Sequence, residues 1–179
     1  MTVLIRVGIL TVSDRSAQGE RPDASGPALA KAVIAYGWQV EWQHILPDDL
    51  KTLKKFLAQK SDDAQVDILL TTGGTGFAHR DVTPEATQAI VQRLAPGLAE
   101  AMRAESLKLT PHAMLSRGIA GIRGNTLIVN LPGSPKAATE HLAVIAPALP
   151  HAVQLLQANP QAENGHHIQS QPKKEYPNE

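Results

Sequence analysis

The residues with the clearest chemical potential form a glycine-rich segment, Thr71-Thr72-Gly73-Gly74-Thr75-Gly76, directly after the apolar run 66–70. Glycine lacks a Cβ atom and tolerates positive φ, so the backbone N–H groups of such a loop can approach a ligand closely. A row of N–H donors suits an anion, usually a phosphate, and the threonine hydroxyls add donors. The spacing excludes a P-loop, because no Gly-Lys-Ser/Thr follows, and a dinucleotide fingerprint, because the third glycine would fall on His79.

Two aspartates are candidates for holding a metal ion. Asp81 lies five residues past the last glycine, where its charge would repel a phosphate unless a cation joined the two. The alternative is a tight turn in which Thr83 caps a helix, Pro84 takes the first helical position and Asp81 favours the helix dipole. For Asp48 the spacing alone favours an ordinary N-cap, because Leu50 begins the next amphipathic segment.

The elements that must position these residues alternate between strand and helix. Apolar β-branched runs predict strands at 3–12, 38–45 and 66–70. Helical periodicity predicts helices from Ser25, from Leu50, over 83–94, over 98–108 and from Ser134 toward Ile145, with a kink or second short helix after Pro147. Residues 119–122 and 126–130 form either a hairpin or two unpaired strands. This order predicts an α/β fold with a mostly parallel sheet.

In a parallel sheet the carboxyl ends of the strands share one edge, and ligands bind in the crevice there. Each chemically unusual loop follows an expected strand, so the sequence predicts a site at that edge. The loops are Ser13-Asp14-Arg15, Pro47-Asp48-Asp49, 71–81 and Asn130-Leu131-Pro132-Gly133-Ser134. Ser13 and Asp14 either reach a ligand or satisfy the loop backbone, and Ser134 is an N-cap whose helix start can also take an anion.

Composition narrows the class of protein. The 179 residues contain 17 basic and 17 acidic side chains and no cysteine. Zero net charge argues against a nucleic-acid or anionic-membrane surface, and the lack of cysteine excludes disulfides and thiolate chemistry. No apolar run reaches the roughly 20 residues that a membrane helix needs, so we expect a soluble, cytoplasmic protein. Residues 1–158 are expected to form one domain, and 159–179 a flexible polar tail.

Taken together, these motifs resemble the MogA/MoaB family of molybdenum cofactor biosynthesis and the G domain of gephyrin. The resemblance extends from about Arg6 to Leu156 and is carried by five segments. They are Thr71-Thr72-Gly73-Gly74-Thr75-Gly76, Arg80-Asp81-Val82-Thr83-Pro84-Glu85-Ala86, Met114-Leu115-Ser116-Arg117, Gly121-Ile122-Arg123-Gly124 and Asn130-Leu131-Pro132-Gly133-Ser134-Pro135-Lys136.

The resemblance implies a three-layer α/β/α sandwich that forms a homotrimer and has molybdopterin adenylyltransferase activity with ATP and Mg²⁺. By motif, the family's two essential aspartates fall on Asp48 and Asp81, which reverses the N-cap interpretation of Asp48. The glycine loop, Ser13-Asp14 and Asn130–Ser134 would bind pterin and nucleotide. A MoeA-type molybdenum insertase is an implied partner. The alternative is a catalytically silent, MoaB-like pterin-binding or scaffolding protein.

The implied chemistry suits these residues. A terminal phosphate of molybdopterin would attack the α-phosphorus of ATP, and this nucleophile is already an anion, so no protein base is required. Positioning and charge neutralisation should dominate, as in phosphoryl transfer generally. Mg²⁺ is usually held by one or two carboxylates and phosphate oxygens, which predicts Asp81 as its anchor and a supporting role for Asp48.

Overall fold

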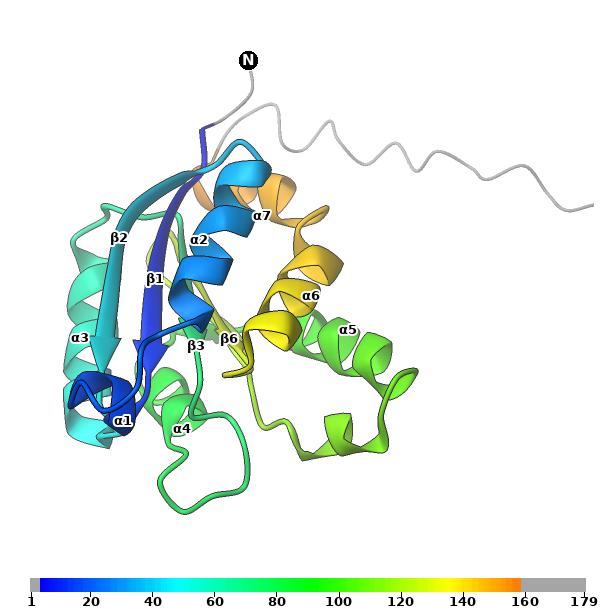
Figure 1. Ribbon diagram of the computed structural model, residues 1–179. Helices are drawn as coiled ribbons and strands as arrows, with labels where there is room; N and C mark the ends of the chain where they lie inside the picture. The colour runs from blue at the N-terminus through cyan, green and yellow to red at the C-terminus, as the bar shows by residue number, and fades with distance from the viewer. Residues whose placement is uncertain (1–3, 159–179) are drawn as a thin grey trace, which may run out of the picture.

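A six-stranded sheet forms the centre of the protein, and helices cover both of its faces (Figure 1). The computed structural model describes residues 4–158, so the predicted polar tail at 159–179 lies outside the described residues. The strands are β1 (Arg6–Val12), β2 (Gln39–Leu46), β3 (Ile68–Thr72), β4 (Arg93–Leu94), β5 (Ala120–Arg123) and β6 (Thr126–Leu131). Their order in the sheet is β2-β1-β3-β6-β5-β4.

The sheet has a parallel part and an antiparallel edge. β2, β1, β3 and β6 run parallel, whereas β5 and β4 are antiparallel to their neighbours. The chain passes from β1 to one side for β2 and then to the other side for β3. In doubly wound sheets such a reversal opens a crevice at the carboxyl ends of the strands. The predicted α/β fold with a mostly parallel sheet is therefore confirmed.

Helices pack in two layers, which the alternation of side chains along the strands separates. The helices are α1 (Asp14–Ala17), α2 (Ser25–Ala35), α3 (Leu50–Asp62), α4 (Thr83–Gln88), α5 (Pro96–Leu107), the 3₁₀ helix η1 (Pro111–Leu115), α6 (Pro135–Ile145) and α7 (Leu149–Leu156). On β3, Ile68 and Leu70 face the core beneath α2, α5, α6 and α7. Leu69 faces the opposite core beneath α3 and α4. The protein is thus a three-layer sandwich.

One predicted helix is wrong at its carboxyl end. α4 stops at Gln88 instead of Leu94, and Arg93–Leu94 is a strand that pairs with β5. The pairing is possible because Val91 packs directly over Gly121, where a Cβ atom would lie 2.7 Å from Val91 Cγ1. The backbone N–H of Gln92 then donates to the carbonyl of Ile122 at 2.8 Å. Strand pairing thus outweighs the helical periodicity of this segment.

Two open questions from the sequence are resolved. Residues 120–131 form a hairpin, since β5 and β6 pair antiparallel around a turn in which Gly124 has a φ of +54°. The break at Pro147 produces two separate helices, α6 and α7. No helix in residues 4–158 is long and apolar enough to span a membrane.

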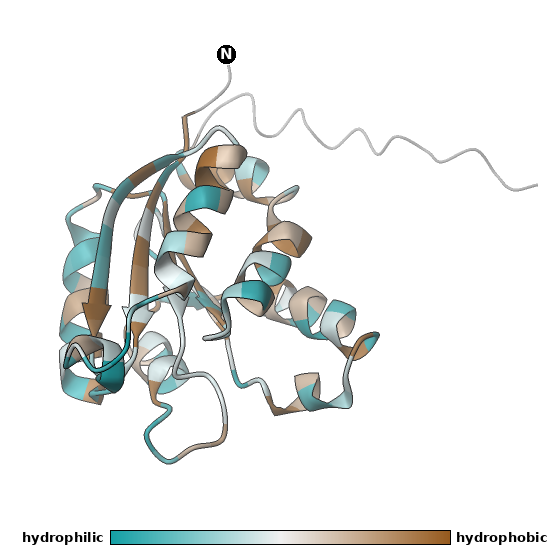
Figure 2. Cartoon of the chain, in the orientation of Figure 1, coloured by the Kyte–Doolittle hydropathy of each residue, from teal (hydrophilic) through white to brown (hydrophobic). Residues whose placement is uncertain are grey.

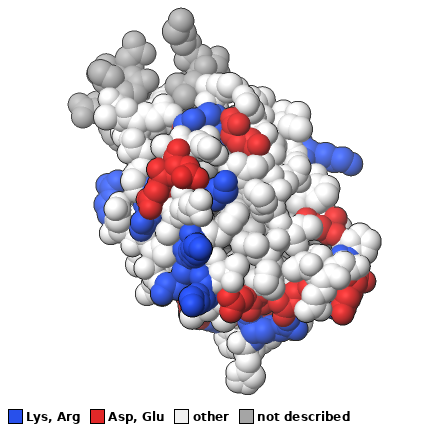
Figure 3. Space-filling view, turned by 90° about the vertical axis from the view of Figure 1, so that its left-hand side faces the viewer, with Lys and Arg blue, Asp and Glu red and all other residues white. Residues whose placement is uncertain are grey.

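Hydropathy differs between the central strands and the segment that begins with α1. Hydropathic colouring places hydrophobic residues along the central strands, while α1 and the segment after it are mostly hydrophilic (Figure 2). On the side of the molecule where β2 and α3 lie, basic and acidic side chains are interspersed (Figure 3). The polar α1 segment is the one that borders the cleft described next.

Candidate functional site

A cleft of about 550 Å³ lies at the carboxyl ends of β1 and β3. It is lined by loops that are far apart in the sequence, as predicted for this edge of the sheet. Nine of the predicted site residues line it: Ser13, Asp14, Asp48, Thr72, Gly73, Gly74, Asp81, Gly133 and Ser134. The strand ends therefore bring both candidate aspartates and the glycine loop into one site.

The glycine loop needs its missing side chains because neighbouring chain segments lie directly against it. Gly73 and Gly74 have φ angles of +101° and +63°. A Cβ atom at Gly73 would lie 2.3 Å from the carbonyl oxygen of Val12, and one at Gly74 would lie 2.9 Å from Asp48 Oδ1. Gly133 approaches from the next loop, where a Cβ atom would lie 3.2 Å from Gly73 Cα. Side chains at these positions would collide with the neighbouring segments and displace the loop.

Threonine hydroxyls hold the loop in this conformation. Thr72 Oγ1 donates to the carbonyl of Pro132 at 2.7 Å. Thr83 Oγ1 donates to the carbonyl of Gly73 at 2.9 Å, and the Thr83 N–H donates to the carbonyl of Gly74. The predicted role of Thr83 as the cap of α4 is therefore wrong, because its hydroxyl is used by the loop. The N-cap is Val82, which makes no side-chain capping bond.

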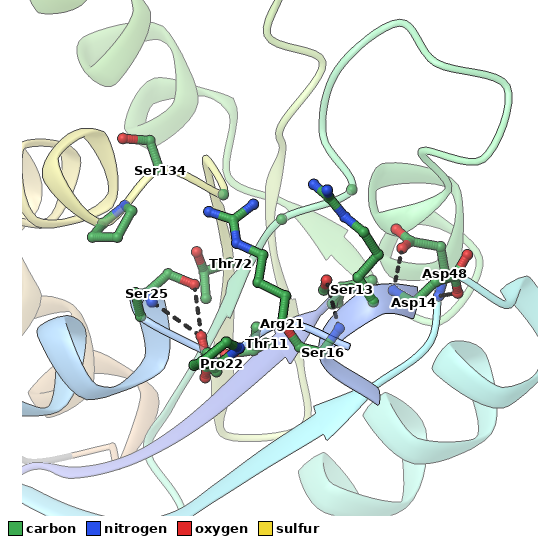
Figure 4. Close-up of a pocket in the computed structure, with 18 of the residues that line it drawn as sticks. Thr11, Ser13, Asp14, Ser16, Arg21, Pro22, Ser25, Asp48, Thr72 and Ser134 are labelled. Carbon is green, nitrogen blue, oxygen red and sulfur yellow. Dashed lines mark hydrogen bonds between the residues drawn. The ribbon is translucent and has the colours of Figure 1, made fainter. Parts of the chain in front are cut away.

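Asp48 is not the N-cap of α3. The cap is Asp49, whose carboxylate accepts from the Thr52 N–H at 2.8 Å. Asp48 instead faces the loop after β1 and exchanges hydrogen bonds with Asp14 (Figure 4). The Asp14 N–H donates to Asp48 Oδ2 at 3.0 Å, and the Asp48 N–H donates to Asp14 Oδ1 at 2.8 Å. This exchange fixes both loops at the cleft and leaves Asp48 Oδ1 pointing over Gly74.

Asp48 and Asp81 form an electrostatically unfavourable pair. Burial, and after it the negative charge of Asp81, raise the pKa of the Asp48 carboxyl above its usual value. Each carboxylate lies against a glycine, since a Cβ atom at Gly76 would be 2.8 Å from Asp81 Oδ2. Within residues 4–158, no group of three or more His, Asp or Glu side chains is placed to hold a metal ion. Two carboxylates beside the glycine loop are too few to enclose a metal ion by themselves. They fit a divalent cation whose remaining ligands come from a bound phosphate.

Basic side chains also line the cleft, and no sequence pattern predicts a role for Arg15 or Arg21. Arg80 forms an ion pair with Asp14. Arg15 and Arg21 also line the cleft, and Figure 4 shows the Arg21 side chain extending across it. Arg15 lies in α1, and Arg21 lies in the loop between α1 and α2, whose polar composition gives no periodic signal.

Asp23 anchors that loop at the edge of the cleft. Its carboxylate accepts from Thr11 Oγ1 at 2.7 Å and from the N–H groups of Ser25 and Gly26 at 3.0 and 3.1 Å. The side chain therefore connects β1 to the start of α2. An aspartate two residues before Ser-Gly-Pro is a capping signal that could have been read from the sequence.

Four predicted binding residues do not line the cleft: Thr75, Gly76, Asn130 and Pro132. Asn130 is buried, and its Nδ2 donates to the hydroxyls of Thr71 and Thr87 at 3.0 and 2.9 Å. Its Oδ1 accepts from the Ile119 N–H. With its amide saturated inside the protein, Asn130 joins β6 to β3 and α4, and its predicted contact with the substrate is not supported.

Comparison with known proteins agrees with this geometry. Residues 8–151 match the family described as "Probable molybdopterin binding domain". A molybdopterin adenylyltransferase of Helicobacter pylori strain J99 is 42% identical over 168 residues, which cover 93% of this chain and 96% of the relative. The molybdopterin adenylyltransferase of Escherichia coli K12 is 36% identical, covering 86% of each chain.

A solved structure shares the fold. The molybdopterin biosynthesis enzyme MoaB of Thermus thermophilus superposes with a TM-score of 0.82 at 48% sequence identity, covering 88% of this chain and 99% of that one. The family match over residues 8–151 includes the glycine loop and both aspartates. The chain therefore belongs to the MogA/MoaB molybdopterin-binding family.

Proposed function

We propose that the protein is a molybdopterin adenylyltransferase, which transfers AMP from ATP to the terminal phosphate of molybdopterin and releases pyrophosphate. The observation that carries this proposal is the pair Asp48 and Asp81 over the glycine loop, inside the cleft of a chain 42% identical to such an enzyme. A silent scaffold would have no need for two mutually repelling carboxylates at this position.

The transfer balances without a protein nucleophile. An oxygen of the molybdopterin phosphate forms a bond to the α-phosphorus of ATP, and the bond from that phosphorus to the bridging α–β oxygen breaks. The backbone N–H of Gly74 holds phosphate, since that of Gly73 donates to the carbonyl of Leu131 at 3.1 Å, and Arg15, Arg21 and Arg80 offset the phosphate charge. Asp48 and Asp81 would hold Mg²⁺, which when bound neutralises further charge on the phosphates.

Catalysis by this chain would therefore consist of alignment and charge balance. The nucleophile is an anion, and the leaving pyrophosphate needs cations more than protons. Because the loop is already hydrogen-bonded in its glycine-specific conformation, the phosphates enter a prearranged set of donors.

The test is direct. The protein is incubated with ATP, MgCl₂ and molybdopterin, and adenylylated molybdopterin and pyrophosphate are measured in equal amounts. The silent alternative predicts molybdopterin binding without product at any magnesium concentration. Omission of MgCl₂ with excess chelator should abolish product, and product that persists would contradict the metal role of Asp48 and Asp81.

Assembly and location form a separate part of the proposal. We propose a homotrimer, a MoeA-type molybdenum insertase as partner and a cytoplasmic location, which the family resemblance implies. Exposed apolar side chains near the end of α5 support assembly, among them Leu107, Leu109 and Met114, with 44%, 76% and 65% of their surface exposed. Sedimentation velocity of the full chain should give a species of three times the chain mass, and a monomer at micromolar concentration would contradict it.

A further inference from the structure

A single arginine outside the cleft spans the base of the loop that carries Asp81. Arg117 lies between η1 and β5, and its Nε donates to the carbonyl of Gly76 at 2.6 Å. Its Nη2 donates to the carbonyl of Asp81 at 2.5 Å, and its Nη1 pairs with Glu85. The guanidinium therefore joins the two ends of the segment 76–81 and ties them to the start of α4.

Between these two points, the ion pair of Arg80 with Asp14 ties the segment to α1. Residues 77–80 are exposed, with Phe77 at 67%. Inside the segment, the Asp81 N–H donates to the carbonyl of Ala78 at 2.8 Å, and the Ala78 N–H donates to Asp81 Oδ2 at 3.1 Å. These bonds orient the Asp81 carboxylate only while the ends of the segment stay at a fixed separation. Arg117 is bonded to both ends, through the carbonyls of Gly76 and Asp81.

Arg117 is itself well held. Its N–H donates to the carbonyl of Thr75 at 2.9 Å, and Arg103 Nη1 donates to the neighbouring carbonyl of Gly118 at 2.8 Å. The Arg117 side chain is 33% exposed, so water screens the pair with Glu85 only in part. Partial burial would raise the pKa of the Glu85 carboxyl, but the hydrogen bond and charge of Arg117 outweigh it and keep that pKa below its usual value.

We infer that Arg117 is a positioning residue for the proposed adenylyl transfer: by bridging the carbonyls of Gly76 and Asp81 it holds the Asp81 carboxylate where a magnesium–nucleotide complex binds. The inference rests on the proposed function. It identifies the side chain that positions Asp81, the proposed magnesium ligand. A planar guanidinium reaches two carbonyls and a carboxylate at once, whereas an ammonium group cannot match that fork. Residues that orient metal ligands commonly change metal affinity when they are replaced.

The chain offers a matched control. Arg123 makes the same kind of three-point contact, with Nε and Nη2 donating to Asp62 and Nη1 donating to the carbonyl of Ile90. Its side chain is 25% exposed, close to the value for Arg117. Asp62 and Ile90 do not line the cleft. Loss of either arginine should therefore cost similar stability, but only Arg117 should affect the site.

The experiment measures binding of the non-hydrolysable analogue α,β-methylene-ATP by calorimetry across a range of MgCl₂ concentrations. We compare the wild type, Arg117→Ala, Arg117→Lys and Arg123→Ala. Both Arg117 variants should need about 10- to 100-fold more magnesium for half-maximal binding. Arg117→Lys keeps a charge for Glu85 and guards against misfolding of the alanine variant. Free guanidinium should partly rescue Arg117→Ala.

Amide hydrogen exchange provides a readout that does not involve ligand. The N–H groups of Ala78 and Asp81 should exchange about tenfold faster in the Arg117 variants, since local opening becomes easier. The N–H of Thr83, which donates to Gly74 without help from Arg117, should keep its rate. Arg123→Ala should leave all three amides unchanged.

Each outcome decides the inference. Unchanged magnesium dependence in the Arg117 variants overturns it, and so does an equal effect of Arg123→Ala, which would indicate general loosening. A wild type that shows no magnesium-dependent binding of the analogue also overturns it. A wild type that binds the analogue but forms no adenylylated product refutes the proposed function alone, and the Arg117 comparison still stands or falls on its own measurements.

Discussion

Two aspartates at opposite ends of the parallel sheet differ in the hydrogen-bond donors and charges that surround their carboxylates. Asp67 precedes β3 at the amino end, is 3% exposed, and accepts three hydrogen bonds from Arg6 and one from Gln157. Asp48 follows β2 at the carboxyl end, is partly buried, and accepts one hydrogen bond, from the N–H of Asp14, within residues 4–158. The first carboxylate is saturated with donors, and the second is left with a like charge beside it.

The electrostatics follow from these contacts. Burial would raise the pKa of Asp67, but the bonds from Arg6 and Gln157 outweigh it and lower the pKa overall. At Asp48 burial and Asp81 both raise the pKa, and too few donors oppose them. The difference indicates that Asp67 stabilises the fold, whereas the charge of Asp48 opposes it, a pattern that is common at functional sites.

The largest expected effect is a loss of activity, and it concerns only the carboxyl end of the sheet, where Asp48 and Asp81 lie. Asp81→Asn should lower adenylylation by about 10²- to 10³-fold, because a neutral amide binds magnesium weakly, an effect comparable to losing one strong electrostatic contact in a transition state. Product formation in a single turnover measures it, and thermal melting checks the fold. Asp62→Asn, at an exposed acid outside the cleft, is the control. Near wild-type turnover in Asp81→Asn would mean that the carboxylates at the carboxyl end of the sheet are not needed for activity.

The next effect concerns stability alone. Asp67→Asn should lower the free energy of unfolding by roughly 2–3 kcal/mol, because Arg6 loses a buried partner. Since the folded pKa of Asp67 is lowered, its contribution is fully present above the unfolded pKa of about 3.9 and is lost as the pH falls through the folded pKa. Urea unfolding from pH 3 to 7 measures this. Nucleotide binding by the folded variant should equal that of the wild type, and weaker binding would contradict the comparison.

Two glycines test whether nucleotide binding requires the absence of a side chain beside Asp48. Gly74 and Gly124 both have positive φ, +63° and +54°, but a side chain at Gly124 would meet nothing within 4 Å. Valine at either site should cost about 1–2 kcal/mol of backbone strain. Gly74→Val should also weaken binding of α,β-methylene-ATP by about tenfold or more, because its Cβ atom would lie 2.4 Å from Thr83 Oγ1 and 2.9 Å from Asp48 Oδ1 and would displace the glycine loop. Equal calorimetric affinities for the two folded variants would show that the cradle is not used.

The smallest effect has the opposite sign to that of Asp67. Without ligand, Asp48→Asn should raise the free energy of unfolding at pH 7 by less than about 1 kcal/mol, since the charge is partly screened by water. Because the folded pKa of Asp48 is raised, its penalty is absent below the unfolded pKa and grows as the pH rises through the folded pKa. The difference in melting temperature between variant and wild type, followed from pH 3 to 7, should therefore increase from zero. A decrease would mean that Asp48 is a structural residue like Asp67.

Much of this comparison could be read from the sequence because it depends on local rules. A buried run followed by Gly73-Gly74 predicts a turn with close backbone approach, and strand–helix alternation places the loops at one edge. The distance of Asp81 from the glycines predicts it as a metal ligand. Asp48 needed the family resemblance, because its spacing to Leu50 favours a cap that Asp49 in fact provides.

What the sequence did not predict depends on contacts between distant segments. Thr83 has the spacing of a helix cap, and only the fold shows that its hydroxyl meets the carbonyl of Gly73. Arg117 is 36 residues from Asp81, and no periodicity connects them. Asn130 lies within β6 near its carboxyl end, and the register with β3 places its amide against Thr71 and away from the cleft.

The buried amide of Asn130 has a consequence for how the protein receives its ligand. It donates to Thr87, whose hydroxyl donates to the carbonyl of Thr83, whose own hydroxyl holds Gly73. The glycine loop is thereby connected to the interior of the sheet, and its conformational entropy is lost when the chain folds. A nucleotide that arrives later meets a surface already ordered, so more of its interaction energy remains for affinity and for alignment of the reacting phosphates.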